Sequence, residues 1–233
     1  MAKLMSLLWG AGSPPCWRVM ITLEEKKLQG YKRKLLSFEK GEHKSQEVLE
    51  VNPRGQLPAF KHGDIILNES CATCLYLENQ FKSQGIKLIP DSADDQAAMY
   101  QHMMEGLALT DKLNSVIYYD CSVPEEERHD FAVKRNKEAL TAELKLWEGY
   151  LENVAAGSYL AGAFSLADVI VFPSIACAFR FGNMMCFLFR LSVGRYPKLA
   201  KYYSLLKNRA SIKTTWPPHW VASPQGYDIL KDL

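Results

Sequence analysis

The chain has 233 residues, 48% of them hydrophobic and 23% charged, which is enough for one large domain or two small ones with a buried core. Its formal net charge is +2, and it carries no basic stripe with interleaved aromatic residues, which argues against nucleic acid as a partner. The late apolar run over 184–189 is far shorter than the ~20 residues of a membrane-spanning helix, so no membrane association is expected.

The cysteines and histidines indicate the cellular compartment and the absence of a metal. The cysteine spacing is irregular and the chain is not small, so a reducing cytoplasm is predicted rather than a disulfide framework. No Cys/His set has zinc spacing and the five histidines are scattered, so no metal site is predicted. The six cysteines are Cys16, Cys71, Cys74, Cys121, Cys177 and Cys186.

Strand and helix signals alternate over the first eighty residues in the order βαβαββα. This order predicts a small mixed sheet with helices packed against it. For residues 4–9 the alternative is a short signal peptide, although Gly-Ser-Pro-Pro at 12–15 interrupts it at once. The expected elements are a strand over 4–9, a helix over 14–28, a strand over 32–38, a helix over 44–52, strands over 56–61 and 64–68, and a helix over 69–83.

After residue 83 the strand signals end. Residues 84–94 are predicted to be a linker and residues 95–233 an all-helical domain. The sequence SLAD predicts a capping box, in which the Ser165 hydroxyl accepts from the Asp168 amide and the Asp168 carboxylate accepts from the Ser165 amide. Pro173 is expected to kink the helix that follows. The expected helices cover 94–120, 125–155, 165–182 and 196–208.

The first candidate site lies in GSPPCWRV, residues 12–19, where a strand gives way to a helix. Proline is tolerated at the first helical position, so a helix that begins at about Pro15 puts Ser13 near its N-terminus. Exposed amides and the positive end of the helix dipole favour an anion there, and the Ser13 hydroxyl can donate to a negative sulfur or oxygen. The alternative is that Ser13 is only an N-cap.

Two further clusters suit a peptide-like ligand. In NPRGQLPAF, residues 52–60, a cis Leu57–Pro58 bond would turn the Leu57 amide and carbonyl outward to pair with an extended ligand; the alternative is an ordinary turn. In NES, residues 68–70, Glu69 can hold an ammonium group and Ser70 with nearby amides a carboxylate; the alternative is a plain helix cap. A ligand that matches all three clusters is a small peptide with a thiol and free carboxylates, which describes glutathione.

Together GSPPCWRV, KGEH, NPRGQLPAF, NES and FSLADV resemble a cytosolic glutathione transferase over nearly the whole chain. The SPPCWRVMI…EEK and SPQG…LKD stretches are most similar to the rho class, best known from fish, with the theta and delta classes next. The resemblance implies a thioredoxin-like, glutathione-binding domain over 1–83, a following α-helical domain and a homodimer. It also implies no tightly bound cofactor, glutathione as co-substrate, and a small hydrophobic electrophile as second substrate in detoxification.

The resemblance also assigns roles to residues. Tyrosine-type classes carry Tyr at the end of the first strand, where this chain has Trp9, so a serine-type mechanism is implied, with Ser13 stabilising the glutathione thiolate. The Leu57 backbone, next to Pro58, would pair with the cysteinyl unit, and Tyr118 would line the electrophile site unless it is a core aromatic. The other expected contacts are His43, helped by Lys44, at the glycine carboxylate, Gln56 on the ligand, and Glu69 and Ser70 at the γ-glutamyl head.

Three alternatives remain open. Cys16, near a helix N-terminus and Arg18, could carry thiol transfer or reduction through a mixed disulfide. The CxxC formed by Cys71 and Cys74 has redox spacing, but it follows a later hairpin, and small residues packing in a helix are the alternative. The fold also serves non-enzymatic ligand-binding relatives. An extra apolar segment over 184–193 departs from the family pattern and bears on pocket shape and stability.

Overall fold

The computed structural model describes residues 4–154, 158–181 and 195–222. These residues form two compact units. Unit 1 comprises residues 4–89 together with 209–222, and unit 2 comprises the described residues of 90–208. Within the described ranges, no helix is long and apolar enough to cross a membrane. A late segment of the chain thus belongs to the same unit as its first residues.

Unit 1 is built on four strands, β1 (Met5–Trp9), β2 (Lys32–Leu35), β3 (Ala59–His62) and β4 (Ile65–Leu67). They form one mixed sheet in the order β2-β1-β3-β4. β1 is parallel to β2 and antiparallel to β3, and β3 is antiparallel to β4. Leu7 and Phe60 are cross-strand neighbours on the two central strands, and both are fully buried. The middle of the sheet is therefore also the middle of the hydrophobic core of this unit.

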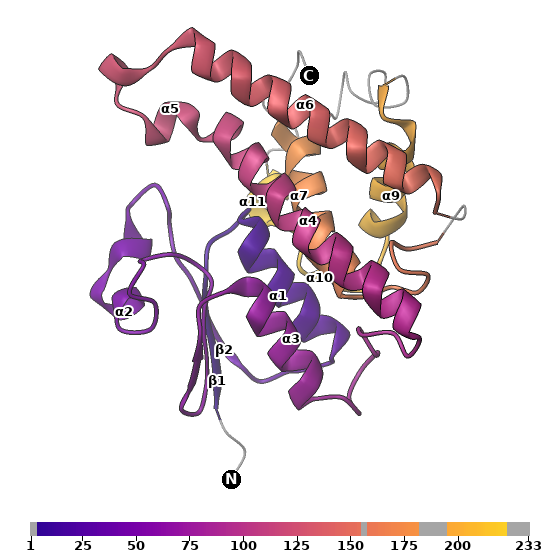
Figure 1. The fold of residues 1–233 in the computed structure, drawn as a ribbon. Helices are drawn as coiled ribbons and strands as arrows, with labels where there is room; N and C mark the ends of the chain where they lie inside the picture. Colours follow the sequence, from indigo (N-terminus) through magenta and orange to yellow (C-terminus); the bar gives the residue numbers. More distant parts are fainter. Residues whose placement is uncertain (1–3, 155–157, 182–194, 223–233) are drawn as a thin grey trace. The chain divides into compact units, whose positions relative to one another are not determined.

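The helices of unit 1 lie on both sides of this sheet. Helices α1 (Pro14–Glu25) and α3 (Ser70–Gln80) pack together on one side, and α2 (Gln46–Leu49) lies on the other (Figure 1). A 3-10 turn, η1 (Glu42–Lys44), precedes α2. The predicted order βαβαββα is confirmed, although α1 ends at Glu25 rather than at Leu28.

Two short helices that the sequence does not predict, α10 (Ala210–Thr214) and α11 (Pro218–Ala222), complete unit 1. Their polar attachment is the carboxylate of Glu25, in the last turn of α1. Its Oε2 accepts from Arg209 Nη2 at 2.9 Å, and its Oε1 accepts from the Ser211 hydroxyl. The Glu25 side chain is only 7% exposed, so this ion pair is largely shielded from water.

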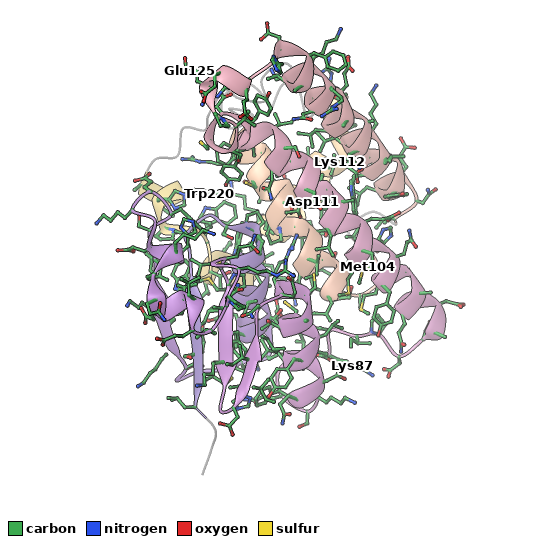
Figure 2. The ribbon with its side chains drawn as sticks, turned by 60° about the vertical axis from the view of Figure 1, so that its left-hand side comes forward. Lys87, Met104, Asp111, Lys112, Glu125 and Trp220 are labelled. Carbon is green, nitrogen blue, oxygen red and sulfur yellow. The ribbon has the colours of Figure 1, made fainter. Side chains whose placement is uncertain are left out.

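The second attachment of this segment is aromatic. The Trp17 indole on α1 packs edge-on against Trp216 and Trp220, with ring centroids 5.2 and 5.6 Å apart. Its N–H donates to Thr215 Oγ1 at 2.8 Å. Trp220, labelled in Figure 2, lies on α11 and is 6% exposed. Edge-to-face pairs of this kind add to the stabilisation that burial of the rings already gives.

Unit 2 consists of helices around a buried one. Nearly every side chain of α7 is buried, and α7 packs against α4 and α9, while α4 also packs against α6. Pro173 lies inside α7, which continues through it, and the expected kink stays a prediction. The extra segment over 184–193 and the SPQG…LKD stretch lie outside the described residues. The elements are α4 (Ala93–Ile117), α5 (Tyr119–Ser122), η2 (Glu125–Glu127), α6 (Asp130–Glu152), α7 (Leu166–Phe181) and α9 (Pro197–Lys207).

The four helices predicted after residue 94 are present as α4, α6, α7 and α9. The helix expected over 125–155 begins later, at Asp130, because η2 occupies the first residues of that range. The fold class, a mixed-sheet domain followed by a helical one, is confirmed.

The capping box at the start of α7 is confirmed in one half and wrong in the other. The Asp168 carboxylate accepts from the Ser165 amide at 2.9 Å, but the Ser165 hydroxyl accepts from the Ala167 amide rather than from that of Asp168. Asp168 also accepts from the Leu160 amide at 3.1 Å and from the Tyr202 hydroxyl at 2.8 Å. Burial raises the pKa of Asp168 to about 6, and these hydrogen bonds oppose that rise. One fully buried carboxylate thus joins three segments of unit 2.

Asp168→Ala is expected to lower the free energy of unfolding by about 3 kcal/mol or more, because it removes the acceptor of four buried donors, the Leu160 and Ser165 amides and the Ser165 and Tyr202 hydroxyls. Urea unfolding followed by circular dichroism measures this change. Glu152→Ala, which removes an exposed carboxylate at the end of α6, is the matched control and should change stability by under about 0.5 kcal/mol. A loss of less than about 1 kcal/mol for Asp168→Ala would contradict this role.

Glu25→Gln is expected to loosen the 209–222 segment, because an amide cannot balance the charge of Arg209. The expected cost is about 1–3 kcal/mol, less than for a fully buried pair because Arg209 is 22% exposed. Hydrogen exchange read by mass spectrometry should speed up in 209–222 more than in the central strands. Glu24→Gln, on the same helix turn, is the control. Equal exchange in both variants would show that the Glu25–Arg209 ion pair does not hold this segment.

Candidate functional site

The loops that carry the predicted site residues lie at one end of the strands of the sheet, called here the loop edge. Ala59, the first residue of β3, is opposite Leu8 on β1, so the chain just before β3 lies beside the end of β1. Leu67, the last residue of β4, pairs with Phe60 and therefore reaches the same edge. β2 runs parallel to β1 and ends there as well. The loops in question carry Ser13, His43, Gln56 with Leu57 and Pro58, and Glu69 with Ser70.

Ser13 is the N-cap of α1, with φ −75° and ψ 117°, and its Oγ accepts from the Cys16 amide at 3.4 Å. That bond uses a lone pair of the oxygen, so the hydroxyl hydrogen stays available to a ligand. The side chain is half-buried. Capping the helix and donating to an anion are therefore compatible roles for the same hydroxyl.

The expectation of exposed amides at the start of α1 is wrong. Pro14 and Pro15 have no N–H, and the Cys16 amide is bound to the Ser13 hydroxyl. The Trp17 amide is bound to the Ser13 carbonyl at 3.0 Å. In the first turn of α1, the hydrogen-bond donor left for an anion is thus the Ser13 hydroxyl, with the helix dipole behind it.

Cys16 is 1% exposed, and its Sγ accepts from the Gly10 amide at 3.4 Å. Burial raises the pKa of the Cys16 thiol to about 11, and hydrogen bonds with Gly10 and Ser13 only partly oppose this rise. The thiolate is the reactive form of cysteine, so a thiol with this pKa is a poor nucleophile near neutral pH. The Arg18 guanidinium does not lower the pKa of Cys16; its Nη1 donates to Ser70 Oγ at 3.3 Å.

The Leu57–Pro58 peptide bond is cis, the geometry considered from the sequence. Asn52, which the sequence marks only as a helix end, is 1% exposed, and its Nδ2 donates to the Gln56 carbonyl at 2.8 Å. The Gln56 side chain is exposed. The Leu57 amide and carbonyl hydrogen-bond to no other described residue. The Asn52 side chain thus fixes this loop, and the Leu57 amide and carbonyl are available to pair with an extended ligand.

The start of α3 brings two charges together. Glu69 is the N-cap of α3, is exposed, and makes no capping bond with its side chain. Ser70 is 6% exposed and accepts from Arg18, which is itself 2% exposed. Arg18 has no local sequence signal for this cluster, because its partner Ser70 is 52 positions away in the chain. A carboxylate and a buried guanidinium thus flank the helix start, which suits a ligand head that carries both an ammonium and a carboxylate.

Three buried polar atoms at this edge have no hydrogen-bond partner in the described chain: Trp9 Nε1, His43 Nδ1 and Asn68 Oδ1. An unpaired buried polar group costs about 1–3 kcal/mol. A ligand that pairs with them would recover part of that cost. Lys44 donates to the Arg54 carbonyl at 3.2 Å, and its expected help to His43 stays a prediction.

The remaining candidates lie elsewhere. Tyr118 ends α4 in unit 2 and is 41% exposed, so it is not a core aromatic, and its place in an electrophile site stays a prediction. In α3, Cys74 is fully buried and its pKa is raised to about 12 by burial, while Cys71 is half-buried with a raised pKa of the same cause. These values favour the interpretation of the CxxC as helix packing.

Family models recognise both halves of the chain. Residues 12–80 match "Glutathione S-transferase, N-terminal domain", and residues 109–215 match "Glutathione S-transferase, C-terminal domain". The chain belongs to the glutathione S-transferase family. Transferase activity, with glutathione as co-substrate, follows from this membership. The predicted family and enzyme class are therefore confirmed, whereas the individual site residues stay predictions.

Similar proteins cover the chain almost completely. Glutathione S-transferase A of Pleuronectes platessa is 64% identical over 234 residues, which is 100% of both chains. A crystal structure of a glutathione S-transferase from the Antarctic clam Laternula elliptica has 37% identity and a TM-score of 0.82, covering 98% of this chain and 99% of its own. The glutathione transferase URE2P6 from Phanerochaete chrysosporium, solved in complex with oxidized glutathione, has 25% identity and a TM-score of 0.78, covering 95% and 98%.

In the native protein, Cys16 is expected to be alkylated at least about 100-fold more slowly than Cys121 at neutral pH. Cys121 is exposed, whereas Cys16 is buried with a pKa of about 11, which leaves very little thiolate. Mass spectrometry of peptides after timed iodoacetamide treatment measures both rates, and the urea-unfolded chain is the control in which both should react. If native Cys16 is alkylated as fast as Cys121, its thiolate is accessible and the cysteine-type mechanism is supported instead.

Proposed function

We propose that this transferase is a cytoplasmic, homodimeric enzyme of the serine type, most similar to the rho class. It joins the glutathione thiolate to small hydrophobic electrophiles. The rho assignment is supported by the SPPCWRVMI motif and by the 64% identity to the Pleuronectes platessa protein. The thiolate attacks an electrophilic carbon and displaces a leaving group or adds directly, so no covalent enzyme intermediate is needed.

The observation that carries the mechanism is the hydrogen bonding of Ser13. Its Oγ accepts from the Cys16 amide through a lone pair, which leaves the hydroxyl hydrogen able to donate to a ligand. A hydrogen bond to a charged acceptor contributes about 1.5–3 kcal/mol. A donation of this strength to the sulfur lowers the thiol pKa from its ordinary ~8.5 by one unit or more.

The rest of glutathione then lies along the edge of the sheet. The Leu57 backbone pairs with the cysteinyl unit, next to Pro58, and the exposed Gln56 side chain contacts the ligand. His43 approaches the glycine carboxylate. At the other end, Glu69 holds the ammonium and Ser70, backed by Arg18, holds the carboxylate of the γ-glutamyl head. Tyr118 contributes to the electrophile site from the helical unit.

Two other functions are less well supported. Thiol transfer through Cys16 needs a thiolate that burial disfavours. A purely ligand-binding relative would bind glutathione without needing the Ser13 hydroxyl hydrogen as a donor to the thiolate.

Ser13→Ala is expected to lower kcat/KM for conjugation of an activated aryl halide by about 100-fold, the effect of losing one donor to a developing or full anion. Glutathione affinity, measured by calorimetry, should change by less than about threefold, because most contacts are elsewhere. Ser13→Thr, which keeps the hydroxyl and the cap, should retain most of the rate.

Two outcomes of that experiment would overturn the mechanism. If Ser13→Ala is unaffected and Cys16→Ala is inactive, the protein is a thiol transferase. If the wild type binds glutathione but conjugates none of a panel of aryl halides, epoxides and unsaturated carbonyls, it is a ligand-binding relative.

A further inference from the structure

The site on α1 offers the glutathione sulfur few hydrogen bonds. Pro14 and Pro15 supply no amide, and the Cys16 and Trp17 amides are bound to Ser13. Anionic groups with strongly lowered pKa values accept two or three hydrogen bonds in proteins. A single hydroxyl therefore leaves room for a second donor from another element of unit 1.

The imidazole of His219 lies against the residue that precedes Ser13. A Cβ atom placed on Gly12 would be 2.7 Å from His219 Cε1 and 3.0 Å from its Nε2. Gly12 also has φ 78°, a conformation that favours glycine. The missing side chain at Gly12 is thus what allows the ring to approach the turn that leads into α1. The ring edge that approaches is the one that bears Nε2, a nitrogen able to donate a hydrogen bond.

The backbone of His219 is fixed by the buried residue next to it, whereas the imidazole itself is exposed. His219 is exposed, whereas Trp220, the next residue of α11, is buried and packs edge-on against Trp17 and Trp216. The imidazole is 6.1 Å from the Trp220 ring, centroid to centroid, and nearly perpendicular to it. An anchored backbone with an exposed imidazole is the arrangement expected of a side chain that meets a ligand.

We propose that His219 is a second hydrogen-bond donor to the glutathione sulfur, which acts together with the Ser13 hydroxyl. This inference rests on the proposed function and adds a residue from the far end of the chain to the same site. The imidazole donates through Nε2–H to the thiolate, and the thiol proton itself goes to solvent. His219 is then a catalytic residue in the sense that it touches the reacting atom.

His219→Ala is expected to raise the pKa of enzyme-bound glutathione by about one unit and to lower kcat/KM by about tenfold at a pH below that pKa. The bound thiol pKa is read from the ultraviolet absorbance of the thiolate during a pH titration. Glutathione affinity measured by calorimetry well below that pKa should change by less than about threefold, because the donor acts on the thiolate.

Two substitutions separate donation from packing. His219→Gln keeps an N–H donor and should retain most of the rate, whereas His219→Phe keeps a ring over Gly12 without a donor and should resemble His219→Ala. His129→Ala, at the exposed N-cap of α6 in unit 2, is the matched histidine control and should leave all three readouts unchanged.

The inference is overturned if His219→Phe behaves as wild type, because the ring then only packs against Gly12. It is also overturned if the His219 variants leave the bound thiol pKa unchanged while Trp9→Phe raises it, because the second donor is then the unpartnered indole at the end of β1. In both cases the wild type still conjugates glutathione. Failure of the proposed function itself looks different, since the wild type would then show no conjugation.

Discussion

The carboxylate of Glu25 joins residues that are 184 positions apart in the chain, and the candidate site depends on that junction. Glu25 ends α1 and accepts from Arg209 and Ser211, which begin the late segment of unit 1. The next residue, Lys26, is the C-cap of α1; it is fully buried and pairs with Glu78 of α3 at 2.8 Å. α1 is therefore fixed at its C-terminal end to two other elements, and this leaves its N-terminal end, with Ser13, as a rigid platform for a ligand.

Ser13 and Cys16 differ in how deeply they are buried at the start of α1, and this difference determines which of the two can act on a ligand. Both residues lie at the start of α1, where the Cys16 backbone amide donates to the Ser13 hydroxyl oxygen. Burial raises the pKa of the Cys16 thiol to about 11, so this sulfur stays protonated near neutral pH and is a poor nucleophile. The half-buried Ser13 hydroxyl cannot ionise near neutral pH, but it can donate. In the proposed mechanism the ligand therefore brings the reactive sulfur, and the protein supplies donors and a helix dipole to it.

Sequence reasoning succeeded where local patterns determine the structure. Hydrophobic periodicity predicts the four strands of unit 1, its helices α1, α2 and α3, and the helices α4, α6, α7 and α9 of unit 2. It failed for α10 and α11, which are five residues each, too short for any periodicity, and held by contacts of Glu25 and Trp17 across the whole chain. The same reasoning over-counted the amides of α1, because the two prolines that start the helix also remove its donors. His219 has no sequence signal at all, since its relevance follows from the missing side chain of Gly12.

The energetics indicate which contact holds the late segment. Closing a flexible loop of 184 residues costs about 5 kcal/mol by the logarithmic estimate, and folding of unit 2 reduces this by ordering most of the intervening chain. The Glu25–Arg209 pair, partly exposed to water, contributes about 1–3 kcal/mol. Burial of the Trp220 side chain, which packs against Trp17 and Trp216, contributes about 4–6 kcal/mol from apolar area alone. The aromatic contact therefore supplies most of the stabilisation of the 209–222 segment, and the Glu25–Arg209 ion pair sets where this segment attaches to α1. Because both form only after residues 209–222 have been synthesised, the proposed site at Ser13 and His219 is complete only in the full chain.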